Sequence, residues 1–265
     1  MTNTQNKGTA LITGASSGIG AVYADWLAKQ GYDLILVARN EARLNDLANR
    51  IKANIGRHVE ILEADLTVPA ELHRVEKRLS SDSKITALVN NAGFGGSSKL
   101  IDSNVDDLEN MIYLNVTALT RLTHAVAAPF ASRKKGLIIN IASIVALAPE
   151  LLNGTYSGTK AYVVNLTQSL NRELGGSGVR MQAVLPGAIE TEFWNRAGLP
   201  VNHLPSEIVM SADELVDAAL AGLALGEVIT IPSLYNIRDW EVMEEARLAL
   251  GPNLSHQHAA PRYMQ

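Results

Sequence analysis

The chain has 265 residues, of which 47% are hydrophobic and 19% charged, with a formal net charge of −4 and no cysteine. This composition excludes disulfides and cysteine-based metal sites, and it argues against a nucleic-acid-binding protein or a basic membrane-binding face. The polar amino terminus lacks the features of a signal peptide, and no apolar stretch approaches the ~20 residues of a membrane span. We therefore expect a soluble, cytoplasmic protein with neither a membrane nor a nucleic acid as partner.

Short, unbroken apolar runs alternate with segments of helical periodicity along the chain. Unbroken runs are typical of parallel strands that are covered on both faces. The alternation predicts one α/β domain over residues 1–265, a doubly wound Rossmann-type parallel sheet of about seven strands with helices on both faces. The predicted strands are 10–13, 33–38, 58–64, 86–90, 136–142, 180–186 and 227–232, and the predicted helices are about 19–31, 40–56, 67–79, 103–133, 155–175 and 211–226.

One long segment, residues 188–210, shows neither pattern clearly, and the tail 251–265 is irregular. A loop of that length in a compact domain is usually functional or mobile. We expect it to select the substrate, with residues 148–153 and 93–98 as further walls of the site. Its apolar residues fit a lid and packing onto the core equally well: Phe193, Trp194, Leu199 and Val201.

The sequence TGASSGIG (13–20) lies between the first predicted strand and the first helix, with the spacing G-x-x-x-G-x-G. Glycines at such a turn let the backbone approach a pyrophosphate closely and enter a helix N-terminus. A glycine-rich turn can also serve packing alone, but this position in an α/β chain favours nucleotide binding. The candidate cofactor-binding residues in the loop are Gly14, Ser16, Ser17, Gly18, Ile19 and Gly20.

The second predicted strand ends at Ala38 and is followed by Arg39. An acidic residue about twenty residues after the glycine loop would bind the ribose hydroxyls of NAD. An arginine there removes a repulsion against a 2′-phosphate and supplies a charged donor, which is worth about ten- to a hundredfold in preference. We therefore predict NADP(H) rather than NAD(H) as cofactor; the alternative is that Arg39 is simply a solvated strand end.

Tyr156 and Lys160 stand four residues apart in GTYSGTK, one turn apart on one face of a predicted helix. A free tyrosine has a pKa near 10, and bringing that pKa towards 7 requires about 4 kcal/mol. A close ammonium lowers a pKa by about 1–3, so Lys160 would supply most of the change. The pair fits an acid–base group and the charge that tunes it, although the same spacing also occurs by chance.

The glycine spacing, the sequence NNAG at 90–93 and the Tyr156–Lys160 pair together resemble the short-chain dehydrogenase/reductase family. The resemblance covers about residues 8–232 and is to the compact, non-extended branch in its NADP-preferring type. It implies hydride transfer between NADP(H) and a small carbonyl or alcohol substrate. It also implies a homodimer or homotetramer, in which the long helices pack against symmetry mates.

In this family, matching residues form a catalytic tetrad. The serine orients and polarises the carbonyl, the tyrosine transfers the proton, the lysine lowers the tyrosine pKa and holds the nicotinamide ribose, and the asparagine positions a water. The resemblance places these roles on Ser143, Tyr156, Lys160 and Asn115. Two features depart from the family pattern: Thr159 and its neighbour Gly158 replace small residues, and Ser17 stands where many NADP-binding relatives have a basic residue.

The resemblance also implies cofactor contacts at the ends of the later strands. Asp65 would meet the adenine, and the turn that contains Ile189 and Thr191 would meet the nicotinamide amide and the phosphates. Asp65 could also cap a helix, and the residues near 90 and 186 could serve bracing or the bend. The full set is Asp65, Leu66, Asn90, Asn91, Ala92, Gly93, Pro186, Gly187, Ile189 and Thr191, together with Tyr156 and Lys160.

Two other functions remain open on the same residues. A non-enzymatic NADP(H) sensor or interaction protein needs the glycine loop but not the acid–base set. An epimerase or dehydratase would keep the enzyme and change the reaction, although the glycine spacing disfavours it. The histidines show no metal-ligand spacing, and we predict no metal site.

Overall fold

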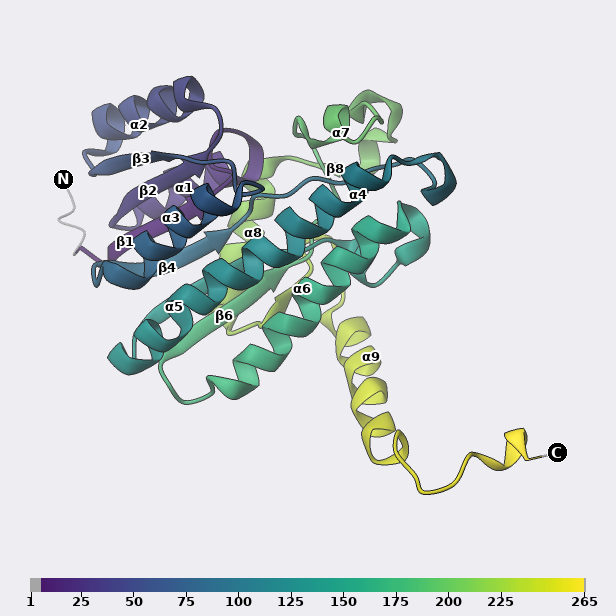
Figure 1. Ribbon diagram of the computed structural model, residues 1–265. Helices are drawn as coiled ribbons and strands as arrows, with labels where there is room; N and C mark the ends of the chain where they lie inside the picture. Colours follow the sequence, from purple (N-terminus) through teal and green to yellow (C-terminus); the bar gives the residue numbers. More distant parts are fainter. Residues whose placement is uncertain (1–5, 265) are drawn as a thin grey trace. The chain divides into compact units, whose positions relative to one another are not determined.

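The computed structural model describes residues 6–264, which divide into a larger unit that ends at Pro232 and a smaller unit that begins at Ser233 (Figure 1). The larger unit holds a seven-stranded sheet in which every pairing is parallel, with the strand order β3-β2-β1-β4-β5-β6-β9. This Rossmann-type α/β fold is the one that the apolar runs predict, and it is confirmed. The strands are β1 (Gly8–Thr13), β2 (Tyr32–Ala38), β3 (Val59–Glu63), β4 (Ile85–Asn90), β5 (Gly136–Ile141), β6 (Val179–Val184) and β9 (Ile229–Thr230).

The sheet is buried on both faces, because successive side chains of a strand point to opposite sides. In β1, Ala10 and Ile12 pack into one hydrophobic cluster and Leu11 into the other. Residues of α1, α2 and α8 contribute to the first cluster, and residues of α3, α5 and α6 to the second (Figure 1). These helices are α1 (Gly18–Lys29), α2 (Glu41–Ile55), α3 (Pro69–Ser81), α5 (Leu119–Arg133), α6 (Gly154–Glu173) and α8 (Ala212–Leu225).

The helix that precedes α5 contains a widened turn that the sequence analysis did not predict. The 3₁₀ turn Leu100–Asp102 is followed by α4 (Val105–Ile112), and the residues Tyr113–Ala118 then form a π-helical turn that leads directly into α5. Such turns occur frequently at functional sites. Asn115 lies inside this turn.

The segment 188–210 is ordered by pairing between its two ends. It contains β7 (Ala188–Ile189), α7 (Phe193–Arg196) and β8 (Val209–Met210), with short 3₁₀ turns between them. β7 and β8 form a small parallel sheet of their own, in which Ala188 lies opposite Val209. These two-residue strands are too short to give an apolar run, so the sequence shows only an irregular segment.

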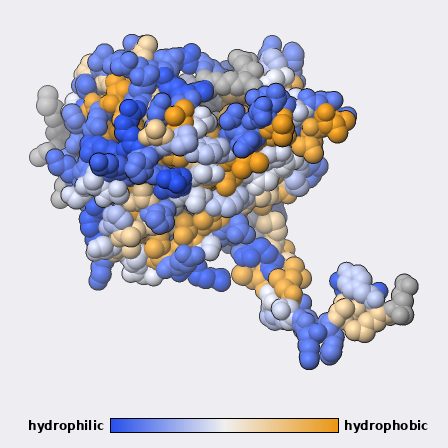
Figure 2. All heavy atoms as spheres, viewed as in Figure 1, coloured by the Kyte–Doolittle hydropathy of each residue, from blue (hydrophilic) through white to orange (hydrophobic). Residues whose placement is uncertain are grey.

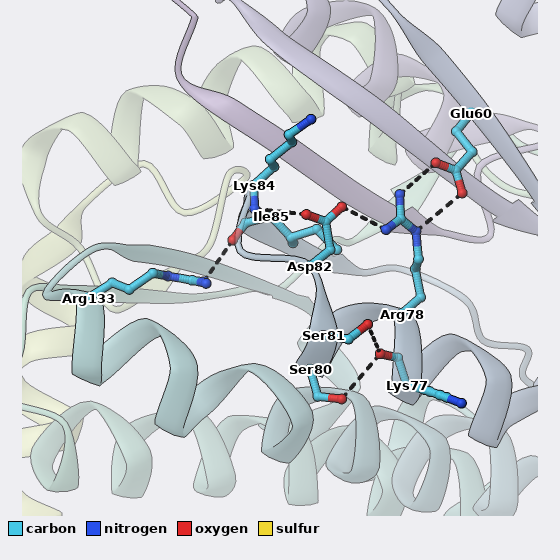
Figure 3. A network of polar contacts seen from close by, with 9 residues as sticks. All are labelled: Glu60, Lys77, Arg78, Ser80, Ser81, Asp82, Lys84, Ile85 and Arg133. Carbon is cyan, nitrogen blue, oxygen red and sulfur yellow. Dashed lines mark hydrogen bonds and ion pairs between the residues drawn. The ribbon is translucent and has the colours of Figure 1, made fainter.

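The amino ends of the strands are joined by a network of charges (Figure 3). Arg78 of α3 donates hydrogen bonds of 3.3 and 2.7 Å to the two carboxylate oxygens of Glu60 in β3. Its remaining nitrogen lies 2.8 Å from Asp82, at the end of α3. Arg133 of α5 donates a 2.9 Å hydrogen bond to the carbonyl of Ile85, where β4 begins. At this edge of the sheet, the charged side chains therefore bind one another and the backbone of the same chain.

The smaller unit, from Ser233, contains the helix α9 (Ile237–Leu250) and two short 3₁₀ turns. The sequence analysis did not predict α9, because its hydrophobic residues do not follow one stripe; ion pairs along the helix, such as Arg238 with Glu245 at 2.9 Å, connect successive turns. That the whole chain acts as one domain stays a prediction. Over the described residues 6–264, no helix has the length and apolar character needed to cross a membrane.

Candidate active site

The candidate site begins at the glycine loop, where β1 ends beside β4. Strand order reverses direction at this point of the sheet, which is where open α/β sheets bind ligands. Gly14 and Gly18 have φ angles of +64° and +53°, which only glycine adopts readily. A Cβ atom on Gly14 would lie 2.7 Å from the Asn91 amide nitrogen, and one on Gly20 would collide with the Gly14 carbonyl. The tight turn into α1 therefore requires glycine and fits the close approach of a dinucleotide pyrophosphate.

The side chain of Thr13 fixes the glycine loop to the segment after β4. Its hydroxyl oxygen accepts hydrogen bonds of 3.0 Å from the backbone N–H groups of both Asn91 and Ala92. The Asn91 amide in turn donates to the carbonyls of Thr13 and Gly14, at 3.0 and 3.1 Å. Sequence reasoning missed Thr13, because a threonine at the end of a strand carries no signal of its own.

The hydroxyl-bearing residues of the loop, Ser16 and Ser17, directly precede α1. Ser16, Ser17 and Ile19 are half-buried, and Ser17 precedes α1 without a capping hydrogen bond from its side chain. The Ser17 hydroxyl is therefore not committed to the helix that it precedes. This position is compatible with the phosphate contact that the resemblance implies.

Asn90 braces the interior of the sheet. It is 3% exposed, and its amide donates to Thr123 of α5 at 3.0 Å and to Asn140 of β5 at 2.9 Å. These contacts match the bracing interpretation, and a cofactor contact by Asn90 stays a prediction. Gly93 lies further along this segment, where an added Cβ would approach the Asn115 amide oxygen at 2.9 Å.

Ser143, Tyr156 and Lys160 are brought together at the carboxyl end of β5. Tyr156 lies in the first turn of α6, whose start Asn153 caps by accepting hydrogen bonds from the backbone of Thr155 and Tyr156. The Ser143 hydroxyl, which follows β5, lies close enough to the Tyr156 phenol to influence its pKa. The Lys160 ammonium donates a 2.8 Å hydrogen bond to the Ile141 carbonyl and lies 5.7 Å from the centre of the Tyr156 ring.

Burial dominates the acid–base properties of this pair. Burial of the phenol raises the pKa of Tyr156, and the neighbouring Ser143 hydroxyl acts in the opposite direction. Burial also lowers the pKa of Lys160 to about 8. Burial therefore opposes the lowering of the tyrosine pKa that the sequence predicts for Lys160, because both side chains lie away from water. That role of Lys160 stays a prediction.

Asn115 is fully engaged inside the π-helical turn. It is 1% exposed; its amide oxygen accepts from the Phe94 backbone at 3.2 Å, and its amide nitrogen donates to the Phe94 carbonyl at 2.9 Å. The same nitrogen donates to the Thr159 hydroxyl at 3.1 Å. Thr159, which in the sequence is only a departure from the family pattern, thus connects Asn115 to the helix that carries Tyr156.

Arg39 and Asp65 lie at the carboxyl ends of β2 and β3. The Arg39 guanidinium is 3.7 Å from the Asp65 carboxylate, and its side chain is 67% exposed. Partial burial acts to raise the pKa of Asp65, but hydrogen bonds from Thr67 and the charge of Arg39 outweigh it and lower the pKa. Asp65 does not cap α3, because that helix begins at Pro69 after Val68. Leu66 beside it is buried.

The segment after β6 closes the site against the glycine loop. The Pro186 carbonyl accepts from Ile144 at 3.0 Å, and the Ile189 carbonyl accepts from the Trp194 indole at 2.9 Å. A Cβ atom on Gly18 would approach the Thr191 methyl group at 3.0 Å. Thr191 therefore lies beside the glycine loop, whereas Pro186, which precedes Gly187, contacts the turn after β5.

Apolar side chains surround Tyr156. The Phe193 ring centre lies 5.7 Å from that of Tyr156, and a Cβ atom on Gly95 would reach both rings. Figure 2 shows hydrophobic residues at the right-hand end of the body, where Figure 1 places the loop before α4. Leu100 and Ile101, which precede α4, and Val105, its first residue, are exposed. The cluster around Tyr156 consists of Phe94, Leu108, Met111, Val145, Leu152 and Phe193.

Known proteins resemble this chain in sequence and in fold. The model of the family described as short chain dehydrogenase matches residues 8–200. A short-chain dehydrogenase from Sphingobium yanoikuyae, solved in complex with NADPH, is 49% identical, with a TM-score of 0.94 over 97% of this chain and 99% of its own. A bulky-bulky ketone specific alcohol dehydrogenase from Comamonas testosteroni is 44% identical, with a TM-score of 0.91 over 98% and 100%. An uncharacterized oxidoreductase from Staphylococcus epidermidis is 33% identical over 76% of this chain and 88% of its own.

Proposed function

The chain belongs to the short chain dehydrogenase family, an oxidoreductase family, and from this premise we propose that it transfers a hydride between NADP(H) and a carbonyl/alcohol substrate with Tyr156 as the general acid and base. One observation carries this proposal: the Tyr156 phenol, the Ser143 hydroxyl and the Lys160 ammonium meet at the edge of the sheet that also bears the glycine loop. A protein that only senses NADP(H) would not need these three acid–base groups close together.

In reduction, bound NADPH supplies a hydride to the carbonyl carbon. The Ser143 hydroxyl donates a hydrogen bond to the carbonyl oxygen and holds it beside Tyr156. The Tyr156 phenol gives its proton to that oxygen as negative charge develops on it, which completes the alcohol. The Lys160 ammonium then stabilises the phenolate, and oxidation runs through the same groups in reverse. General acid–base catalysis of this kind contributes about 10²–10⁴-fold to a rate.

The residues at the carboxyl edge fit NADP(H). The glycine loop leaves the first N–H groups of α1 for the pyrophosphate, and the exposed Arg39 offers a charged donor to a 2′-phosphate. The short-chain dehydrogenase from Sphingobium yanoikuyae was solved with NADPH, which agrees with this choice over NAD(H). The other cofactor contacts follow from the resemblance: Asp65, Asn91, Gly93, Ile189 and Thr191.

For the substrate we infer an apolar ketone, or the matching secondary alcohol, with bulky groups on both sides of the carbonyl. The wall around Tyr156 is built from phenylalanine, leucine, methionine and valine side chains. Burial of apolar surface against such a wall stabilises a bound substrate by about 25 cal/mol per Å². The similar enzyme from Comamonas testosteroni is described as specific for bulky-bulky ketones.

The first experiment follows the oxidation of NADPH, with NADH in parallel, against ketones graded in bulk and polarity, with Tyr156→Phe as the key variant. Tyr162→Phe is the matched control, because Tyr162 lies on the same helix. Among the residues that the structure describes, its hydroxyl forms a hydrogen bond only with Thr120. We expect turnover that favours NADPH and bulky apolar ketones, is lost in Tyr156→Phe and persists in the control. Tight NADPH binding without turnover of any ketone would instead support a sensor, or an epimerase or dehydratase.

A homodimer or homotetramer and a cytoplasmic location stay predictions. The first rests on the family resemblance, and the second on the composition of the chain.

A further inference from the structure

A second arginine stands near the 2′-phosphate position that Arg39 marks. Arg43 lies in the first turn of α2, where its backbone N–H bonds to the capping side chain of Asn40 at 3.0 Å. Asn40 directly follows Arg39, so both guanidinium groups start from the carboxyl end of β2. The N-terminus of a helix also favours an anion.

The Arg43 side chain forms an ion pair across the candidate cofactor site. One of its terminal nitrogens lies 2.7 Å from the carboxylate of Glu192, and both side chains are 45% exposed. Glu192 follows Thr191, which contacts Gly18 of the glycine loop, and precedes Phe193, which contacts Tyr156. The pair thus connects the start of α2 with residues 191–193, which lie beside the glycine loop at one end and beside Tyr156 at the other.

The pair is also easily exchanged. An ion pair between exposed side chains is weak, since water screens both charges. A phosphate group is a stronger partner for a guanidinium, because it accepts two parallel hydrogen bonds and carries more negative charge. Among the ion pairs recorded at this end of β2, the Arg39–Asp65 contact is longer still, at 3.7 Å.

We propose that Arg43 is a second determinant of NADP(H) specificity. Without nucleotide its guanidinium pairs with Glu192, and the 2′-phosphate of NADP(H) replaces the Glu192 carboxylate as the partner of Arg43. The inference rests on the proposed function, because it requires a nucleotide at the carboxyl edge. Arg43, in the first turn of α2, supplies a second positive charge close in the chain to Arg39. NADP(H), unlike NAD(H), would also release Glu192.

The test measures nucleotide affinity without turnover. Dissociation constants for NADPH and NADH come from nucleotide fluorescence, and those for adenosine 2′,5′-bisphosphate and 5′-AMP from calorimetry. The variants are Arg43→Met, Glu192→Gln and their combination. The matched controls are Arg50→Met and Asp25→Asn, which break the 2.6 Å ion pair between Arg50, two turns further along α2, and Asp25 of α1.

In Arg43→Met we expect the Kd of NADPH to rise about five- to twentyfold, as for loss of a charged hydrogen bond near the surface, with little change for NADH. In Glu192→Gln we expect the preference for NADPH over NADH to rise about two- to fivefold, because no exposed ion pair must break. That gain disappears in the combined variant, since Arg43 carries it. The two probes without nicotinamide follow the same pattern, and the Arg50 and Asp25 controls leave the preference unchanged.

Two results would overturn the assignment while the proposed function stands. If Arg43→Met and Glu192→Gln each weaken NADPH and NADH alike, the pair only holds the 192 segment in place. If Arg43→Met changes neither nucleotide, Arg43 does not meet the phosphate. A wild-type protein that binds none of the four compounds would instead overturn the proposed function, and the assignment with it.

Discussion

The two edges of the sheet use arginine in opposite ways. At the amino edge, every nitrogen of the Arg78 guanidinium lies within 3.3 Å of a carboxylate oxygen of Glu60 or Asp82 (Figure 3). At the carboxyl edge, Arg39 has one contact of 3.7 Å to Asp65 and is 67% exposed. An arginine with a close carboxylate contact at each of its three nitrogens supports the fold, whereas one with a long, single contact is available to a ligand.

An uncharged group at the carboxyl edge, the Ser143 hydroxyl, is also held only weakly. The Ser143 hydroxyl makes hydrogen bonds of 3.4 Å to the Pro186 carbonyl and from the Val145 backbone, which are long for a hydroxyl group. We therefore expect changes at the exposed Arg39 and at the weakly bonded Ser143 to alter binding and chemistry while folding is kept. Changes at the amino edge should alter stability alone.

The largest effect is expected for Ser143→Ala. Loss of the hydroxyl that orients the carbonyl should lower kcat by about 10²–10³-fold, as for removal of one donor to a developing oxyanion. The melting temperature should change little, because the bonds lost are long. Steady-state kinetics and thermal unfolding check this, with Ser157→Ala as the control, since the Ser157 hydroxyl bonds only to the Gly154 carbonyl of its own helix in the recorded contacts. An unchanged kcat would show that Ser143 does not touch the substrate.

Arg39→Asp tests the available arginine. A carboxylate at this position repels a 2′-phosphate and accepts hydrogen bonds from ribose hydroxyls, so the ratio of NADPH to NADH affinity should fall about ten- to a hundredfold. Stability should stay near that of the wild type, because Arg39 is exposed. Nucleotide binding followed by fluorescence gives the ratio. Unchanged selectivity would sink the role assigned to Arg39.

Lys160→Met tests what burial does to a charge at the carboxyl edge. The pKa of Lys160 is about 8 in the folded protein, and that of an unfolded lysine is about 10.4. Between these values the unfolded chain binds more protons, so the free energy of unfolding rises with pH, by about 2 kcal/mol from pH 8 to pH 10. Burial raises the pKa of Tyr156 and Tyr23, which lowers stability only above about pH 10, where unfolded tyrosines lose their protons first.

Urea unfolding at pH 8 and pH 10 measures the effect of Lys160. The Lys160→Met protein should lack this rise, while a control at the exposed Lys52 keeps it. If the free energy of unfolding rises equally in wild type and Lys160→Met, the buried Lys160 ammonium is charged at both pH 8 and pH 10.

The smallest effect is expected for Arg78→Met at the amino edge. Loss of its contacts with Glu60 and Asp82 should lower the free energy of unfolding by about 1 kcal/mol, or the melting temperature by about 2–4 °C. Turnover and nucleotide affinity should not change. The control is Lys77→Met, whose side chain points away from the network in Figure 3. A change in kcat/KM for Arg78→Met would break the division between the two edges.

The sequence predicts the frame of the molecule and the edge that carries the site. Seven parallel strands follow from unbroken apolar runs, and the positions of Gly14, Ser143 and Tyr156 follow from their places at strand and helix ends. These signals are local, so a single sequence contains them.

Contacts between distant residues could not be predicted. Thr13 and Thr159 act through partners 78 and 44 residues away, and a threonine looks the same whether it packs or accepts hydrogen bonds. The Arg43–Glu192 pair joins residues 149 apart. The helix α9 was missed for a different reason: its periodicity is obscured by hydrophobic residues around its circumference.

The π-helical turn at Tyr113–Ala118 has a consequence for the helices on either side of it. A turn closed by i→i+5 hydrogen bonds holds an extra residue, so the helix after it is rotated by about one residue, or 100°, relative to the helix before it. α4 packs against α6, and α5 packs against α3 and β4. The added residue thus changes which side of the continuous helix faces its neighbours: the part before Asn115 packs against α6, and the part after it packs against α3 and β4. Deleting a single residue between 113 and 118 would restore the ordinary winding and rotate one of those faces out of register.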